Sequence, residues 1–317
     1  MERRMRAQGK DIVELFGFSP DDQSPPAQQA FHTAFCPFVG NQCGKRNHDG
    51  TITYGVCTVS NGANSPPESD VIACPKRLYT DNYRILQNAA DLAWGADATS
   101  VIAGGSKMEL KERALSSVNP PAVAFGQGSG SEISVHAGGK LSMDWVVQRY
   151  HHSLNGLTPL DYIGIEVQSM DITGNYKAPW EAYAYIKNNT PVDFIPNSGH
   201  GLNWANVIKR LNHQIIKKGN IYSKSKLCSG FFFILPDVVF KRFEEFLGPI
   251  ETQKTPSNKN VSVITYHLSQ HMQRGKIRDL EQTRVIHYSL EDIKKAIVKD
   301  SYDSVAQDLE VSLANIL

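Results

Sequence analysis

The sequence predicts an α/β or α+β fold, because strand-like and helix-like segments alternate along the second half of the chain. Residues 141–150 and 162–170 are rich in β-branched and aromatic side chains, and a polar stretch from His151 to Leu160 separates them. We therefore expect an antiparallel hairpin with its turn in the polar stretch. Two apolar runs, residues 231–235 and 261–266, predict further strands.

Helices are expected between and after these strands. Residues 180–188 and 202–218 have helix-like patterns. A closing helix is expected to begin at Ser289, because Ser-Leu-Glu-Asp resembles a capping box before an apolar run.

Two more helices are expected in the first third of the chain. Residues 11–18 predict a short helix that ends near Gly17. Residues 81–95 predict a longer one, with Asp81 as its N-cap and Gly95 as its stop.

Composition is that of an ordinary globular protein. The 317 residues are 41% hydrophobic and 21% charged, which suffices for one large domain or two modest ones. The net charge of +1 argues neither for nor against a nucleic-acid partner. The start of the chain lacks the apolar run of a secretory signal, and the longest apolar stretch, from Gly230, is too short to span a bilayer. We expect a soluble, cytoplasmic protein with no membrane partner.

The chain is expected to divide near a glycine-rich stretch that begins at Gly126. Residues 23–75 are rich in loops and hold four cysteines, so they have little regular core of their own. The strand-like pattern starts after the glycines. We therefore expect an N-terminal region over residues 1–125 and a second domain over residues 126–317.

Three polar side chains of the predicted hairpin form a candidate catalytic site. Side chains two residues apart on a strand point to the same face, so Glu166 and Gln168 project together. Antiparallel pairing would place Asp144 beside Glu166. Two neighbouring carboxylates suit Mg²⁺, which takes oxygen ligands and keeps water and substrate phosphate as further ligands. On spacing alone, a solvated face of the sheet explains these acids more often than a nuclease site does.

Three longer strings connect these residues with a known family. They are Leu141-Ser-Met-Asp-Trp-Val-Val, Gly164-Ile-Glu-Val-Gln-Ser-Met-Asp-Ile-Thr-Gly-Asn-Tyr and Gly201-Leu-Asn-Trp-Ala-Asn-Val-Ile-Lys-Arg-Leu. In their order and spacing, over residues 11 to 240, the chain resembles the NotI-type restriction endonucleases, particularly the shorter members. The resemblance implies a type II site-specific deoxyribonuclease with a PD-(D/E)xK nuclease core, in which helices flank a mixed sheet.

The resemblance also implies roles for single residues. Asp144 and Glu166 correspond to the ligands of the catalytic Mg²⁺. The third position usually carries lysine in the wider superfamily, whereas the NotI-type branch has glutamine, as at Gln168 here. A neutral amide cannot supply the charge of a lysine, so more of the charge stabilisation is expected from the metal. Glu132 resembles an additional family acid that assists metal binding.

Four of the five cysteines lie in the loop-rich region, at Cys36, Cys43, Cys57 and Cys74. Their spacing is not that of a standard zinc ribbon, and buried reduced thiols without a ligand are one explanation. The other is a tetrahedral Cys₄ metal site that stabilises a segment with little core.

The resemblance favours the metal site, because NotI-type enzymes carry a rubredoxin-like Cys₄ iron site in this region. Thiolates bind zinc as well, so the donors do not choose between structural iron and zinc. His48 is a further possible ligand. Cys228 lies far away in the sequence, beside an apolar run, and is interpreted as a core thiol.

A stretch without acidic residues, from Phe194 to Pro236, is the candidate DNA-binding segment. Its basic residues are Lys209, Arg210, Lys217, Lys218, Lys224 and Lys226. Helical spacing places four side chains on one face as candidate DNA contacts: Asn206, Lys209, Arg210 and His213. A solvated basic face is an alternative, as is structural support of the site by Asn203, Trp204 and Asn206.

The expected function is therefore that of a type II restriction endonuclease that cuts double-stranded DNA with Mg²⁺. The resemblance implies a GC-rich palindromic target, such as one containing GGCC, a homodimer, and functional pairing with a cognate DNA methyltransferase. Two alternatives stay open. One is a non-catalytic, metal-stapled DNA-binding protein, and the other is a metal-dependent hydrolase of a different phosphoester.

Overall fold

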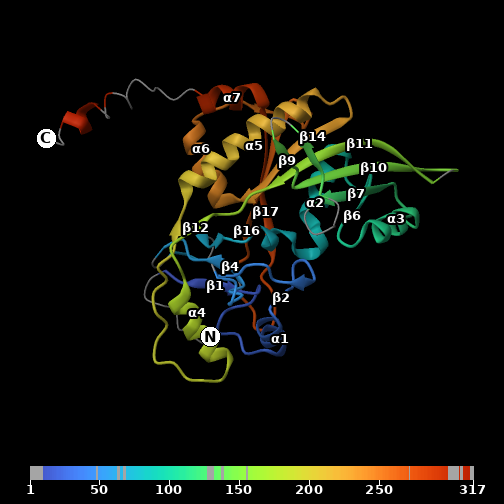
Figure 1. Cartoon of the computed structure of the whole chain (residues 1–317). Coiled ribbons are helices and arrows are strands. Elements are labelled where there is room, and N and C mark those ends of the chain that lie inside the picture. Colours follow the sequence, from blue (N-terminus) through green and yellow to red (C-terminus); the bar gives the residue numbers. More distant parts are fainter. Residues whose placement is uncertain are drawn as a thin grey trace.

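A large mixed sheet organises the computed structural model, which describes residues 10–47, 49–62, 65–66, 69–126, 132–136, 139–154, 156–270, 272–298, 307 and 310–314 (Figure 1). Its eight strands lie in the order β15 (Thr252–Gln253), β17 (Leu280–Ser289), β16 (Asn260–Leu268), β14 (Cys228–Pro236), β11 (Gly156–Val167), β10 (Trp145–Ser153), β7 (Pro121–Gly126) and β6 (Ser100–Ile102). β14 pairs in parallel with both β11 and β16, and β6 pairs in parallel with β7, whereas the other neighbours are antiparallel. The predicted mixed α/β class is confirmed.

Helices cover both faces of the sheet. One face packs on α2 (Thr80–Trp94), whose buried side chains join Ile165, Val167 and Ile234 in one apolar cluster. The other face packs on α5 (Trp204–Lys224), α6 (Asp237–Leu247) and α7 (Leu290–Val298), which gather on the same side in Figure 1. α3 (Lys107–Leu115) lies at the β6–β7 end of the sheet. Because both faces are covered, the central strands are buried almost continuously.

The predicted hairpin is present, but its turn is shorter than expected. β10 and β11 pair antiparallel, with Trp145 opposite Ile165 and Ser153 opposite Gly156. Residues 151–153 and 156–160 belong to the strands, so the broad turn predicted from His151 to Leu160 is wrong. Polar side chains tolerate strand pairing there because this end of the hairpin is largely exposed and projects from the sheet (Figure 1).

Most of the other expected elements are also present. The runs 231–235 and 261–266 lie in β14 and β16. α4 (Lys177–Lys187) and α5 correspond to the two expected helices. The closing helix is α7, where Asp292 N–H donates to Ser289 Oγ at 3.4 Å.

The expected helix over residues 11–18 is wrong. Residues Ile12–Leu15 form β1, which pairs antiparallel with β4 (Val56–Val59), and β4 pairs with β5 (Val71–Ile72). All four consecutive residues of β1 are buried, so side chains on both faces of the strand are packed. A surface helix would bury only one of its faces. Tertiary packing therefore overrides the local pattern.

Of the two predicted ends of α2, the N-cap is wrong and the C-terminal stop is confirmed. Asp81, Asn82 and Tyr83 have left-handed backbone angles, with φ of 53°, 54° and 63°. An N-cap residue needs an extended backbone, so Asp81 cannot fill that role. Gly95 follows the last residue of the helix, and its N–H donates to the carbonyl of Asp91 at 2.9 Å.

The expected boundary between residues 125 and 126 falls inside β7. That strand pairs with β10 along Ala122 to Gly126, so β6 and β7 belong to the same sheet as the proposed nuclease strands. Of the glycine-rich stretch, residues 127–131 lie outside the described residues. No helix among the described residues has the length and apolar character needed to cross a membrane.

The remaining elements are short. They are α1 (Pro25–Thr33), β2 (Phe35–Cys36), β3 (Asn41–Gln42), the 3₁₀ helix η2 (Pro75–Tyr79), β8 (Ser134–His136), β9 (Lys140–Ser142), β12 (Ile172–Thr173) and β13 (Gly201–Leu202). β2 pairs with β3, β8 with β9, and β12 with β13, each pair antiparallel.

Candidate active site

Asp144 and Glu166 lie side by side, as the hairpin register requires. Asp144 immediately precedes β10, and Glu166 is the second-last residue of β11. The backbone N–H of Asp144 points at Glu166 Oε1, 3.4 Å away, and Asp144 Oδ2 accepts a hydrogen bond of 3.0 Å from the N–H of Val167. The predicted proximity of the two carboxylates is present in the structure.

Glu166 points to the face of the sheet that α5 covers. Ile165 and Val167 belong to the apolar cluster on the opposite face, as strand alternation requires. A Cβ on Gly164 would lie 2.1 Å from the ring of Tyr222, so only glycine lets α5 approach β11 this closely. Glu166 is 0% exposed, and it meets one cation there: the ammonium of Lys218 donates to Glu166 Oε2.

Electrostatics at this pair favour a further cation. The pKa of Glu166 is raised to about 8: burial and then the nearby Asp144 carboxylate raise it, and Lys218 opposes both effects. Two ionised carboxylates are therefore unfavourable here without more positive charge.

Lys218 is the site residue that sequence reasoning assigned to the wrong surface. We expected it within the basic, solvent-facing segment, yet its side chain is only 4% exposed. The signal was present in the helical spacing. Lys218 lies three residues after buried Ile215 and four before buried Tyr222, so it falls on the buried face of α5. Lysine side chains are almost never fully buried unless they are paired, as Lys218 is with the Glu166 carboxyl group.

Gln168 and Glu132 are placed differently. Gln168 lies just beyond β11, is 2% exposed and donates its Nε2 to the carbonyl of Ser169 at 2.6 Å. Its Oε1 has no hydrogen-bond partner among the described residues. Glu132 is exposed, although the next residue, Ile133, accepts a 2.9 Å hydrogen bond from Met143 N–H beside Asp144.

The carboxylate pair fits a hard divalent cation in its donor chemistry. One oxygen of each carboxylate is held by the protein, through Val167 N–H on Asp144 and through Lys218 on Glu166. Of the second oxygens, Glu166 Oε1 receives only the long 3.4 Å contact from Asp144 N–H, and Asp144 Oδ1 has no hydrogen bond within the described part of the chain. Mg²⁺ is commonly bound by two carboxylates plus water and phosphate. Within the described residues, no group of three or more His, Cys, Asp or Glu side chains is arranged to hold a metal ion.

The four clustered cysteines line one cavity of about 280 Å³, and none of them forms a disulfide. Backbone N–H groups of Phe38 and Val39 point at the sulfur of Cys36, and that of Lys45 points at Cys43. Such contacts stabilise thiolates, whereas burial raises the pKa of both thiols. The four thiols share this cavity, but among the described residues their side chains are not gathered into a metal-ligand set.

The fifth cysteine, interpreted from the sequence as a core thiol, does not line this cavity. Cys228 is buried in β14, where its thiol donates to the carbonyl of Gly230 at 3.4 Å. His48 lies outside the described residues.

The four expected DNA contacts are all exposed on α5, but two of them have protein partners. Asn206 and Arg210 bond to the carboxylate of Asp171, Arg210 at 2.9 and 3.2 Å. Lys209 and His213 are exposed on the same helix. Asn203, considered as structural support, caps α5 by accepting the N–H of Asn206 at 3.1 Å.

Comparisons with known proteins add no assignment: no protein-family model matches the chain, and no curated protein matches it significantly.

A pH series tests the environment of Glu166. Its pKa rises from 4.5 to about 8 on folding, so the folded state holds the proton more tightly, and this contribution to stability is lost as pH rises towards about 8. Relative to Glu166→Gln, the wild type should therefore lose unfolding free energy between about pH 5 and pH 8 in urea titrations. A pH-independent difference between the two would contradict this. Glu251→Gln, at an exposed position, is the control.

Proposed function

We propose that the protein is a type II restriction endonuclease that hydrolyses phosphodiester bonds of double-stranded DNA with Mg²⁺. The observation that carries the proposal is the pairing of half-buried Asp144 with fully buried Glu166, beside the cation of Lys218. A buried carboxylate with a strongly raised pKa and specific charged neighbours is typical of functional sites. The family resemblance of the strings around these residues supports the same reaction.

Asp144 would hold the metal through Oδ1, and Glu166 through Oε1, which receives only the 3.4 Å contact from Asp144 N–H. When bound, Mg²⁺ supplies Lewis-acid polarisation of the scissile phosphate and neutralises developing charge. The residues themselves orient the ligands: Val167 N–H fixes one carboxylate, and Lys218 fixes the other. Gln168 has a free amide oxygen near the end of β11, which can accept a hydrogen bond from the attacking water.

Lys218 partly compensates for the absence of a lysine at the third position, which Gln168 occupies. The sequence suggested that the neutral Gln168 leaves more of the charge stabilisation to the metal. In the structure, a lysine reaches Glu166 from α5 instead of from β11. We infer that it orients the buried Glu166 carboxyl group and makes its ionisation less costly.

The same ion pair also favours a second candidate function. Buried pairs of this kind occur as purely structural features, and Lys218 already satisfies one oxygen of Glu166. In that case the protein binds DNA without cutting it. Digestion of plasmid and genomic DNA with added Mg²⁺ separates the two: discrete fragments support the endonuclease, and binding without cleavage supports the second function.

The remaining proposals follow the resemblance. We propose structural iron or zinc at Cys36, Cys43, Cys57 and Cys74, supported by their shared cavity and by the N–H groups directed at two of the sulfurs. A homodimer that reads a GC-rich palindrome, such as one containing GGCC, paired with a cognate methyltransferase in the cytoplasm, completes the proposed restriction system.

Replacing either carboxylate tests the reaction. Asp144→Ala and Glu166→Ala should each lower the cleavage rate by about a thousandfold or more, because they remove a ligand of an ion worth several kcal/mol to the transition state. DNA binding, measured by electrophoretic mobility shift, should survive. Cleavage at the wild-type rate in either variant would refute the assignment, and Glu251→Ala, at an exposed site, is the matched control.

Lys218 is tested by metal binding without DNA. Lys218→Met should weaken Mn²⁺ binding about 10- to 100-fold in titration calorimetry, as expected for a residue that positions a ligand. Lys218→Arg should restore part of the affinity. Lys217→Met removes the same charge from the neighbouring exposed position and should leave binding unchanged. Equal affinities in the Lys217 and Lys218 variants would show that Lys218 has no such role.

The cysteine cavity is tested by elemental analysis and thermal melting. Cys36→Ser should lower both the metal content and the melting temperature, because the metal would supply folding energy to a region with short strands. Cys228→Ser removes a buried thiol outside the cavity and should leave the metal content unchanged. Purified wild type without iron or zinc would contradict the site.

A further inference from the structure

A second side chain of α5, Tyr222, lies beside the ion pair of Glu166 and Lys218. A Cβ on Gly164 would lie 2.1 Å from Cζ of Tyr222, the ring carbon that carries the hydroxyl. Gly164 and Glu166 are two residues apart on β11, so they lie on the same face of the strand. Lys218 and Tyr222 are four residues apart, so they lie on the same face of α5. Tyr222 therefore covers the strand position next to the one that Lys218 contacts.

The two contacts between α5 and β11 are neighbours in space. Two residues of a strand span about 6.6 Å, and four residues of a helix span about 6 Å. The order of the contacts is reversed between the two elements, so α5 runs antiparallel to β11 here. The hydroxyl of Tyr222 and the ammonium of Lys218 are therefore adjacent groups on one buried surface.

The Tyr222 hydroxyl is buried without a partner. The residue is 2% exposed, and its oxygen has no hydrogen-bond partner among the described residues. Its ring packs against Phe231, with ring centres 4.8 Å apart, and Tyr162 lies 6.3 Å away. An unpaired buried hydroxyl costs free energy that a phenylalanine would not. Departures of this kind from complete pairing are expected at functional sites.

The Lys218 ammonium has donors to spare. An ammonium carries three N–H groups, and within the described part of the chain the structure gives Lys218 one acceptor, Glu166 Oε2. The unpaired oxygen of Tyr222 lies one turn further along the same face of the helix. Lys218 can therefore exchange one partner for the other without leaving the buried surface.

A divalent cation on the two carboxylates would change which partner suits Lys218. The oxygens proposed for the cation are Asp144 Oδ1 and Glu166 Oε1, and the ammonium contacts the other oxygen of Glu166. Two cations on one carboxylate repel each other, and the repulsion is strong in a buried site where water screens it little. The Tyr222 hydroxyl offers the displaced ammonium a neutral acceptor.

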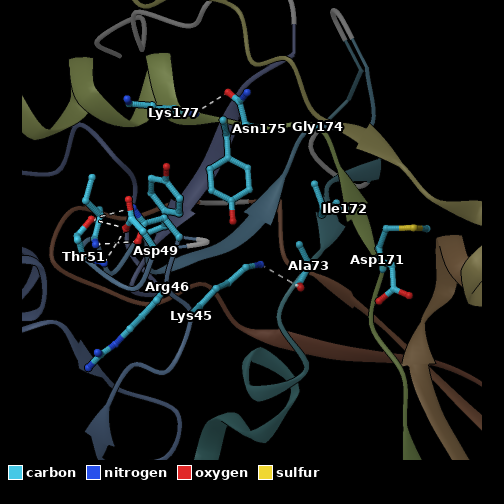
Figure 2. Close-up of a pocket in the computed structure, with 15 residues that line it drawn as sticks. Lys45, Arg46, Asp49, Thr51, Ala73, Asp171, Ile172, Gly174, Asn175 and Lys177 are labelled. Carbon is cyan, nitrogen blue, oxygen red and sulfur yellow. Dashed lines mark hydrogen bonds between the residues drawn. The ribbon is translucent and has the colours of Figure 1, made fainter.

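The carboxylate pair has an open side and a closed side along β11. Beyond the strand, the chain continues into Asp171 and Ile172, which line a groove of about 800 Å³ (Figure 2). Gly164 lies on the other side of Glu166, where the ring of Tyr222 covers it. Because Tyr222 is buried on the closed side, it does not face a substrate in that groove. Its role at the site is that of a positioning residue.

We propose that the Tyr222 hydroxyl is a second position for the Lys218 ammonium, which moves there from Glu166 when a divalent cation binds the carboxylates. The hydroxyl oxygen accepts an N–H of Lys218, and its own O–H can donate to the Glu166 oxygen that the ammonium leaves. All three groups then have partners. The inference rests on the proposed function, because it takes Asp144 and Glu166 to be the ligands of the cation.

The test removes the hydroxyl and keeps the ring. Full-length protein is titrated with Mn²⁺ in calorimetry, and the binding that Glu166→Ala abolishes identifies the site. Tyr222→Phe should weaken this binding about tenfold or more, because a hydrogen bond to a charged group is lost in the cation-bound state alone. Without added Mn²⁺, the melting temperature of Tyr222→Phe should equal or exceed that of the wild type, because no hydrogen bond is lost there.

Tyr266→Phe is the matched control. Tyr266 is also 2% exposed, but it belongs to the apolar cluster on the opposite face of the sheet. Its hydroxyl accepts a 2.9 Å hydrogen bond from the side-chain amide of Asn88. Tyr266→Phe should therefore lower the melting temperature and leave the Mn²⁺ affinity unchanged, which is the reverse of the pattern expected for Tyr222→Phe.

A double variant tests whether the hydroxyl acts through the lysine. In a Lys218→Met background, Tyr222→Phe should have no further effect on Mn²⁺ affinity, because the ammonium that the hydroxyl receives is absent. Additive losses from the two substitutions would overturn the proposed link between them.

The outcomes separate this inference from the proposed function. Wild-type Mn²⁺ affinity in Tyr222→Phe would overturn the second position of Lys218, whether or not the protein cuts DNA. A lower melting temperature of Tyr222→Phe without added Mn²⁺ would also overturn it, because the hydroxyl would then have a partner before the cation binds. So would wild type that binds no Mn²⁺ at this site. Protein that shows the expected binding pattern but never cuts DNA would refute the endonuclease and leave the role of Tyr222 intact.

Discussion

The ion pair between Glu166 and Lys218 constrains the central part of the molecule. Glu166 lies on a strand buried on both faces, where a lone carboxylate would be strongly destabilising. Lys218 compensates, and removing one member of such a pair typically costs about 3–5 kcal/mol. The pair requires α5 to lie directly over β11, which in turn requires glycine at position 164 beneath Tyr222. The same ion pair therefore determines both where α5 lies and which charges surround the proposed site.

A second pair of buried ions ties the cysteine-containing region to the sheet. Arg77 of η2 donates to Glu14 of β1 at 2.9 Å and to the carbonyl of Arg278. Arg278, shortly before β17, pairs with Asp70 at 2.7 Å. Because the cavity of the four cysteines lies between β4 and η2, these contacts fix its position relative to the large sheet.

Local pattern predicted the features that depend on neighbours along the chain. Alternation and antiparallel pairing were enough to place Asp144 beside Glu166, and apolar runs were enough for β14 and β16. Prediction failed where residues distant in the sequence determine the local structure. Residues 12–15 form a strand because they pair with β4, and Lys218 is buried because it pairs with a carboxylate on β11.

The origin of the cation on α5 has a consequence for how such sites are recognised. Lys218 and Glu166 are 52 residues apart in the sequence but in contact in the structure. A linear carboxylate-x-lysine signature requires the lysine on the same strand as the carboxylate, and β11 has none at that position. A scan for that signature passes over this chain at Glu-Val-Gln. Relatives of this kind are better sought by asking which buried helix lysine faces a strand carboxylate, a criterion that tolerates exchange of the third-position residue.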